Sequence, residues 1–174
     1  MASCSRRSRD RGARGGDRDA AQVTVSSWKT TYRGQVPDSY LDDLSVPRRE
    51  EGWRDWFTHE GKEFLVADEN GRIVGFVNFG HSLDEDATPG KTGEVYAIYL
   101  YTESQGKQVG KSLWNGAMQR LRERGFSEAT VWVLDTNRLA REFYERRGGS
   151  LDEAQKVLNI DGQDLLEVRY RVAL

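Results

Sequence analysis

The stretch from Tyr99 to Gly125, which reads YLYTESQGKQVGKSLWNGAMQRLRERG, constrains the fold of this chain more than any other. It begins like the end of a β-strand, passes through a loop with two glycines, and continues as an amphipathic helix. The apolar residues of the helix recur at the spacing of one face, at Leu113, Trp114, Ala117, Met118 and Leu121. A helix with one apolar face must pack on another layer, and Gly125 lies where a helix ends. The stretch therefore predicts a strand, a tight connection and a helix that covers a sheet.

The neighbouring segments extend this pattern into a sheet. GEVYAIYLY, before the loop, and SEATVWVL, after the helix, carry the β-branched and aromatic residues of strands. A strand, a helix and a second strand in this order form a parallel crossover. EFLVADENGRIVGFVNFG and QKVLNIDGQDLLEVRYRVAL predict hairpins, since Asn-Gly at 70–71 and Asp-Gly near 161–162 tolerate the positive φ angles of tight turns. The predicted fold is α/β, with a mixed sheet whose centre is parallel.

Further helices are predicted on either side of these strands. Residues 19–34 place apolar side chains at helical spacing, and PDSYLDDLS reads as a short second helix that Pro37 opens. REEGWRDWFTH predicts a third helix, and the segment from Arg138 to Arg147 predicts another. We expect these helices and strands to form one domain.

Residues 1–18 differ in composition from the rest of the chain. They are rich in Arg, Asp and Gly and hold almost nothing apolar, so they cannot offset the entropy of ordering. We therefore predict a flexible tail over 1–18 and a domain over 19–174. An arm that binds an anionic partner is the alternative reading of the tail.

The composition excludes several classes of function. The 174 residues carry a formal net charge of −2, which lacks the excess of Lys and Arg that binds nucleic acid or an anionic membrane. Cys4 is the single cysteine, so neither an intrachain disulfide nor a Cys/His zinc site is expected. No apolar run approaches the roughly 20 residues of a membrane span, and the N-terminus lacks the apolar core of a secretory signal. We expect a cytoplasmic protein without a metal, whose partners are small molecules or peptides.

The join between strand and helix is itself a candidate binding site. A glycine-containing loop followed by a helix N-terminus presents unpaired backbone N–H groups and the positive end of the helix dipole. Lys107 and Lys111 lie beside it. The pattern favours an anion such as phosphate, although an ordinary tight connection has the same sequence features.

Two motifs around this join give the chain a family resemblance. YAIYLYTESQGKQVGKSL resembles the acetyl-CoA motif of the GNAT superfamily of N-acetyltransferases, Gln/Arg-x-x-Gly-x-Gly/Ala. NRLAREFYERRGG is similar to the second family motif, in which Asn is followed by Ala at +3 and by Phe-Tyr at +6 and +7. SSWKTTYRGQVPDSYLDDLS resembles the first two helices of many bacterial members, so the resemblance runs from about residue 19 to the C-terminus. It implies a single GNAT-like domain with a mixed, centrally parallel and splayed sheet flanked by helices.

The resemblance also implies a site for acetyl-CoA, the acyl donor of the family. The strand before the loop would pair with the pantetheine arm, and the loop amides would wrap the diphosphate. A backbone N–H of the same strand would stabilise the oxyanion. The residues that would bind acetyl-CoA are Ile98, Tyr99, Leu100, Gln105, Gly106, Lys107, Gln108, Val109, Gly110, Lys111, Asn137 and Tyr144.

Catalytic residues follow from the same motifs. Tyr144 occupies the family position of the general acid, and a phenol with a pKa of about 10 suits a thiolate whose conjugate acid is near 8.5. Without the motif, its helix face would be read as core packing. Asn137 has a helix N-cap as its competing reading. Glu94 is our candidate general base, and the competing reading is a carboxylate at the surface or at the strand end.

The implied reaction moves an acetyl group to a primary amine of a small molecule or peptide, by direct attack in a ternary complex. A catalytically silent domain that binds or senses acyl-CoA is the alternative. Trp28 and Tyr32 match the helical region that lines the acceptor pocket in similar proteins, with core packing as the competing reading. The acidic segment 84–87 is either a rim that attracts a cationic amine or a solvated loop. A homodimer is compatible with the family, but no pattern in the sequence fixes an interface.

Three positions depart from the family pattern. Gln108 stands where the first motif glycine is usual, and we expect its Cβ to be tolerated if the backbone there is helical. Trp132 occupies the position of a glutamate base in some protein-acetylating members, and an indole cannot remove a proton. The first strand of the family should precede Asp17, where apolar residues are missing, so we expect that strand to be frayed or absent.

Overall fold

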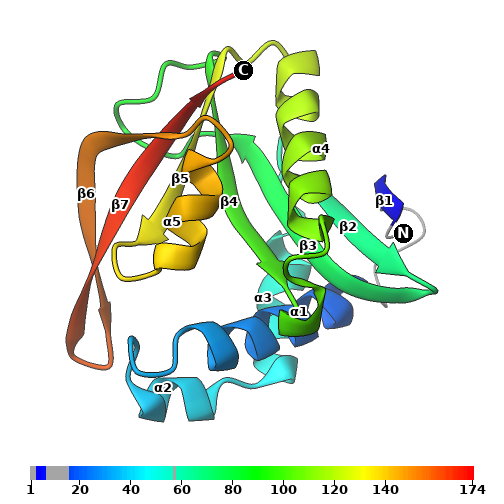
Figure 1. The fold of residues 1–174 in the computed structure, drawn as a ribbon, viewed down its shortest axis with the longest axis vertical. Helices are drawn as coiled ribbons and strands as arrows, with labels where there is room; N and C mark the ends of the chain where they lie inside the picture. Colours follow the sequence, from blue (N-terminus) through cyan, green and yellow to red (C-terminus); the bar gives the residue numbers. More distant parts are fainter. Residues whose placement is uncertain (1–2, 7–15, 57) are drawn as a thin grey trace.

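The computed structural model describes residues 3–6, 16–56 and 58–174 (Figure 1). Its helices are α1 (Gly16–Thr31), α2 (Asp38–Asp43), α3 (Val46–Trp56), the short 3₁₀ helix η1 (Thr102–Ser104), α4 (Val109–Glu123) and α5 (Arg138–Glu145). Its strands are β1 (Ser3–Arg6), β2 (Glu63–Glu69), β3 (Arg72–His81), β4 (Thr92–Leu100), β5 (Glu128–Leu134), β6 (Ser150–Ile160) and β7 (Gln163–Ala173). None of the helices within these described ranges is both long and apolar enough to cross a bilayer.

The strands form one seven-stranded sheet in the order β1-β2-β3-β4-β5-β7-β6. Neighbouring strands are antiparallel except β4 and β5, which are parallel and are joined through α4. Both predicted hairpin turns are present, because the backbone at Asn70 and at Asp161 has φ of 56° and 49° and a glycine with positive φ follows each. The α/β class and the parallel centre of the mixed sheet are therefore confirmed.

Helices cover both faces of the sheet. On one face lie α4 and α5 (Figure 1). Leu113 and Leu121 of α4 and Tyr144 of α5 belong to one core with Val77 and Val95. On the other face, α1 and α3 bury Phe76 and its neighbours from β2 and β3. Side chains on a strand alternate between faces, so the two cores lie on opposite sides of the same strands.

The two central strands diverge partway along their length. β4 and β5 are paired only where Thr92–Val95 lie opposite Glu128–Val131. Beyond this point, β4 continues to Leu100 on β3, while β5 continues to Leu134 on β7. A β-bulge at Tyr96 bends β4 where the pairing stops, since an extra residue increases local twist. The result is a wedge between the carboxyl ends of two parallel strands, which confirms the predicted splay.

The N-terminal segment differs from the prediction at both of its ends. Ser3–Arg6 form β1, which pairs antiparallel with Leu65–Asp68 of β2, and α1 begins at Gly16 with Asp17 only 3% exposed. Residues 7–15 of the predicted tail lie outside the described residues. The missed strand is an edge strand, and backbone hydrogen bonds to β2 hold such a strand without an apolar pattern. The expectation that the first strand is absent is therefore wrong.

Two carboxylates of the acidic segment 84–87 bind a buried arginine, whereas Glu85 is exposed as in a solvated loop. Arg169 of β7 is 4% exposed and donates hydrogen bonds to the carboxylates of Asp84, Asp86 and Asp152. Breaking a buried ion pair by removing one partner typically costs about 3–5 kcal/mol. The network therefore fixes the loop after β3 against β7 and compensates the charges of Asp84 and Asp86 within the protein.

Candidate active site

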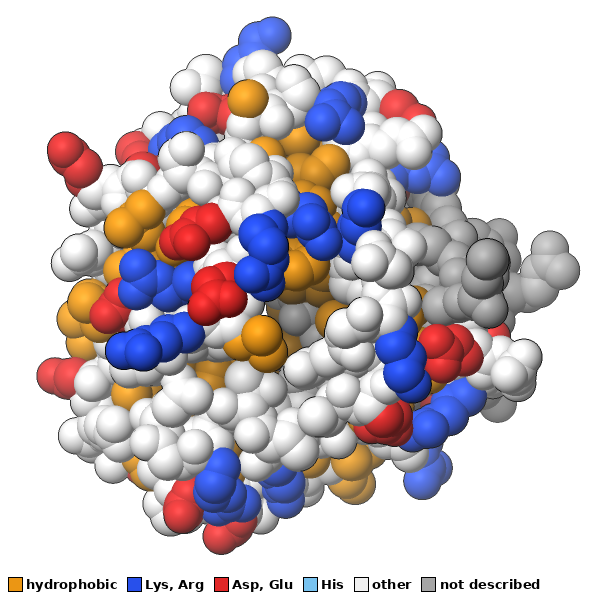
Figure 2. Space-filling view, in the orientation of Figure 1, with side chains coloured by type: hydrophobic (Ala, Val, Ile, Leu, Met, Phe, Trp, Pro, Cys, Tyr) orange, Lys and Arg blue, Asp and Glu red, His pale blue; other side chains and the backbone are white. Residues whose placement is uncertain are grey.

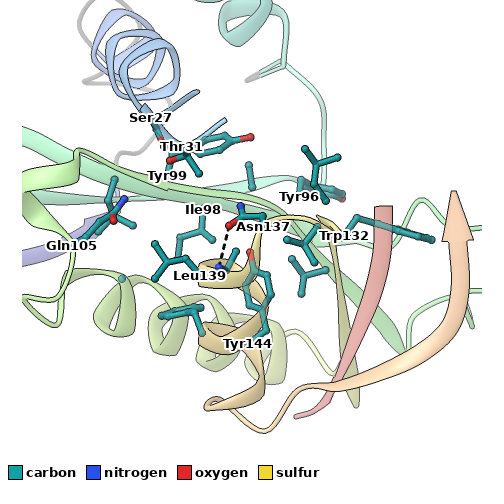
Figure 3. Close-up of a pocket in the computed structure, with 18 of the residues that line it drawn as sticks. Ser27, Thr31, Tyr96, Ile98, Tyr99, Gln105, Trp132, Asn137, Leu139 and Tyr144 are labelled. Atoms are coloured by element: carbon teal, nitrogen blue, oxygen red, sulfur yellow. Dashed lines mark hydrogen bonds between the residues drawn. The ribbon is translucent and has the colours of Figure 1, made fainter. Parts of the chain in front are cut away.

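A cavity of about 490 Å³ fills the wedge between β4 and β5 (Figure 3). Its walls come from α1, β4, the loop before α4, β5, α5, β6 and β7. Figure 3 shows Gln105 at one end, Tyr96 and Trp132 at the other, and Ile98, Asn137 and Tyr144 between them. We call these the loop end and the strand end of the cavity.

Free backbone amides gather at the loop end. Within the part of the chain that the structure describes, no group accepts a hydrogen bond from the N–H of residues 106–111. Val109 is the first residue of α4, so these amides surround the positive end of the helix dipole. The loop is thus a concave set of donors with the chemistry of an anion site.

Cationic side chains surround the same end. Lys111, Arg146 and Arg147 line the cavity, and Figure 2 shows Lys and Arg side chains in a band across an apolar hollow. The guanidinium of Arg147 lies 4.9 Å from the ring centre of Phe143, and its buried Nε has no hydrogen-bond partner among the described residues. A ligand with several negative charges would satisfy these groups.

Most of the residues expected to bind the cofactor do line the cavity. They are Ile98, Tyr99, Leu100, Gln105, Gly106, Gln108, Gly110, Lys111, Asn137 and Tyr144. Two others do not: Lys107 is exposed outside it, and the side chain of Val109 is 2% exposed within the core under α4. Val109 can therefore contribute only its backbone N–H.

The backbone at Gln108 is left-handed, not helical. Gln108 is the N-cap residue of α4, with φ of +68°. The condition under which we expected its Cβ to be tolerated, a helical backbone, is therefore not met, and a left-handed conformation costs a non-glycine residue about 1–2 kcal/mol. This strain explains physically why a glycine is usual at this position of the motif.

Tyr144 lies in the middle of the cavity wall. Its ring packs on Trp114 with ring centres 5.3 Å apart, and its hydroxyl points toward Asn137 (Figure 3). The hydroxyl makes no hydrogen bond to any described residue. Burial raises the pKa of Tyr144, so the phenol keeps its proton at physiological pH. From the sequence, core packing and a place in the active site were competing readings of Tyr144. In the structure, Tyr144 both packs in the core and lines the cavity.

Asn137 joins the start of α5 to Tyr32, the residue that follows α1. Its Oδ1 accepts a hydrogen bond from the N–H of Ala140 at 3.2 Å, which makes it the N-cap of α5, and its Nδ2 donates to the hydroxyl of Tyr32 at 3.4 Å. Tyr32 and Trp28 both line the cavity, and their rings are 4.8 Å apart. Burial raises the pKa of Tyr32, which therefore remains a neutral phenol.

Glu94 is not a surface carboxylate. It is buried near the start of β4, in the wall of the cavity at its strand end. Its side chain belongs to a residue 7% exposed, and its Oε2 accepts hydrogen bonds from the N–H of Leu83 at 2.9 Å and from Oγ of Ser82 at 3.3 Å. Burial raises the pKa of Glu94, and the N–H of Leu83 opposes this rise. A carboxyl group whose pKa is raised by burial in a cavity is a candidate proton acceptor.

Several residues of the site were not predicted. The cavity is also lined by Tyr96, Lys156, Leu158 and Glu167, besides Trp132, which the resemblance had placed at the position of a base. Tyr96 could have been found from its i+2 spacing to Glu94 on one strand. The other residues reach the site through the pairing of β7 with β5 and β6, which the sequence pattern did not specify.

Comparison with known proteins agrees with this geometry. Residues 25–149 match the model of the acetyltransferase (GNAT) family. The chain belongs to this family. The uncharacterized N-acetyltransferase YuaI of Bacillus subtilis (strain 168) is 38% identical over 121 residues, which are 69% of this chain and 67% of that protein.

Solved structures share the fold of this GNAT acetyltransferase. PaiA N-acetyltransferase from Thermoplasma acidophilum, in complex with coenzyme A, is 20% identical with a TM-score of 0.73, over 100% of this chain and 99% of that one. YncA from Salmonella typhimurium, with acetyl-CoA, is 18% identical with a TM-score of 0.67, and the match covers 99% of this chain and 93% of that one. Family membership confirms the predicted enzyme class, an N-acetyltransferase with acetyl-CoA as donor.

We predict that Gln108→Gly stabilises this acetyltransferase, because glycine adopts positive φ without strain. The gain should be about 1 kcal/mol, which raises the melting temperature by about 2–4 °C for a chain of this length. Thermal unfolding followed by circular dichroism measures it. The matched control is Gln105→Gly, where φ is −70° and glycine relieves nothing. Equal shifts in the two variants would contradict the account of strain.

Proposed function

We propose that the protein transfers an acetyl group from acetyl-CoA to a primary amine of a small molecule or peptide, by direct attack in a ternary complex. The observation that carries this proposal is the order of groups along one cavity. Free amides lie at its loop end, the Tyr144 hydroxyl lies in its middle, and the buried carboxyl of Glu94 lines it beside Tyr96 at the strand end. An acyl donor and an amine can approach each other from the two ends.

The loop end supports the donor part of the proposal. The N–H groups of residues 106–111, with Lys111, Arg146 and Arg147, would hold the diphosphate and neutralise its charge. The edge of β4 from Ile98 to Leu100, which β5 leaves unpaired, would align the extended pantetheine arm as an added strand does. A bound thioester supplies an activated acyl carbon, and an N–H of this edge would stabilise the charge that develops on its oxygen.

Tyr144 is the proposed general acid. Its hydroxyl faces the wedge and has no partner among the described residues, so it is available to donate to a departing thiolate. Burial raises the pKa of the phenol, so Tyr144 carries the proton that a departing thiolate would take.

Glu94 is the proposed general base. An amine attacks only when it is neutral, and a carboxylate in the cavity wall accepts the proton that the amine loses, directly or through one water. Trp132, at the position of the base in some relatives, cannot take this role. Its indole N–H instead donates to the carboxylate of Asp84 at 2.9 Å.

The Tyr144→Phe variant tests the general acid. Loss of the hydroxyl should lower kcat by about tenfold to a thousandfold while the dissociation constant for coenzyme A stays nearly unchanged. Released thiol over a panel of primary amines reports turnover, and calorimetric titration reports binding. Tyr101→Phe, outside the cavity lining, is the control. If Tyr144→Phe turns over at the normal rate, the acid is another group; if the native protein binds coenzyme A but acetylates no amine, it is a silent binding domain.

The pH dependence of turnover tests the general base. Burial raises the pKa of Glu94 above that of a free glutamate, about 4.3, so kcat/KM should fall as the pH drops through this raised pKa and Glu94 becomes protonated. Glu94→Gln should lower kcat by about 10²–10⁴-fold and remove this limb. Protonation of the acceptor gives a separate limb, which moves with the pKa of the amine used. Glu51→Gln, exposed on α3, is the control, and an acid limb that survives in Glu94→Gln would reject the assignment.

A further inference from the structure

An ammonium group of the protein itself occupies the strand end of the cavity. Lys156 and Glu167 lie directly opposite each other in the β6–β7 ladder, and Nζ of Lys156 is 3.7 Å from Oε2 of Glu167. The same Nζ lies 4.1 Å from the ring centre of Trp132, in the geometry of a cation–π contact. We call Trp132, Lys156 and Glu167 the ammonium subsite.

The aromatic wall of the ammonium subsite is held in place from behind. Nε1 of Trp132 donates to both carboxylate oxygens of Asp84, at 2.9 and 3.2 Å. Asp84 is in turn bound by the buried guanidinium of Arg169 at 3.0 Å. The indole is therefore oriented before any ligand arrives, which lowers the entropy cost of binding a cation on its face.

Glu167 is held by one long ion pair. Its side chain is 19% exposed, and among the described residues Lys156 is its single charged partner, at a distance beyond a normal hydrogen bond. Burial raises the pKa of Glu167, and the nearby Lys156 offsets only part of that rise. A better placed ammonium would bind this carboxylate more tightly than Lys156 does.

The charges along the cavity do not balance at this end. Of the described residues that line it at the strand end, Glu94 and Glu167 are acidic and Lys156 is cationic, and the nearby Arg169 is already paired with three aspartates. The remaining lining cations, Lys111, Arg146 and Arg147, are those assigned to the donor phosphates. A cationic acceptor therefore suits the strand end, whereas an acidic acceptor would add to uncompensated carboxylate charge.

We propose that the ammonium subsite binds the second ammonium group of a diamine acceptor, by displacing Lys156 from Trp132 and Glu167. This inference rests on the proposed function, since the first amine of the diamine reacts with the thioester beside Glu94. Lys156 can be displaced because its side chain is 48% exposed and exposed ion pairs contribute little to stability. The substrate class is thus an alkyl diamine or polyamine, with an aliphatic spacer between its two cations.

Paired amines of equal chain length test this proposal. Released thiol is measured with diaminobutane against butylamine and with diaminopentane against pentylamine, at fixed acetyl-CoA. We expect kcat/KM to favour the diamines by at least about tenfold, since a desolvated cation–π contact or ion pair is worth roughly that factor. Glu167→Gln should reduce the ratio toward one, and Lys156→Gln, which removes the competing ammonium, should lower the KM of the diamines.

The control is Glu153→Gln, an exposed residue of β6 outside the cavity lining, which should keep the ratio of the native protein. Calorimetric titration of diamine and monoamine in the presence of coenzyme A gives a second readout that needs no turnover. Diamine binding that is about tenfold tighter and is lost in Glu167→Gln supports the subsite even if no amine is acetylated. Equal binding of the paired amines overturns the subsite, and leaves the proposed function standing if thiol is still released.

Discussion

The site depends on the divergence of β4 from β5 beyond Val95 and Val131. Two adjacent parallel strands normally pair along their length, because an unpaired backbone group in the interior is costly. Here, each strand keeps its outer neighbour and loses the inner one, and the bulge at Tyr96 bends β4 at the point of separation. The unpaired edges form the walls of a cavity that crosses the sheet. A ligand with its own amide groups can restore the missing pairing.

The cavity is polarised by the elements that close it. At one end, α4 directs its N-terminal amides inward, and cationic residues of α4 and the end of α5 add positive charge. At the other end, β4 and β7 contribute the carboxyl groups of Glu94 and Glu167. Between them, burial keeps Tyr32 and Tyr144 as neutral phenols. In the proposed reaction, this distribution would orient a polyanionic donor and a cationic acceptor in opposite directions, with their reactive groups in the middle of the cavity.

Much of this arrangement could be predicted from the sequence, because local sequence patterns specify the loop and its helix. The glycines and the amphipathic stretch after Tyr99 predicted the loop and α4, and the resemblance to the second GNAT motif implied that Asn137 and Tyr144 lie at the site. Other features depend on contacts between distant segments. β1 is held by its pairing to β2, Arg169 compensates a loop far from it in the chain, and Lys156 meets Trp132 only through the order of β5, β7 and β6. The left-handed backbone at Gln108 was not predicted, because glutamine rarely adopts a positive φ angle. It was visible only in the structure.

The central claim is that the wedge and the free amides of the loop form one donor site. Amide chemical shifts of the ¹⁵N-labelled protein, titrated with coenzyme A, test it most directly. The account predicts that the largest changes fall on the amides of residues 106–111 and on Ile98 to Leu100 of β4, and that they saturate together. Saturable binding that leaves these amides unchanged and shifts others would contradict it.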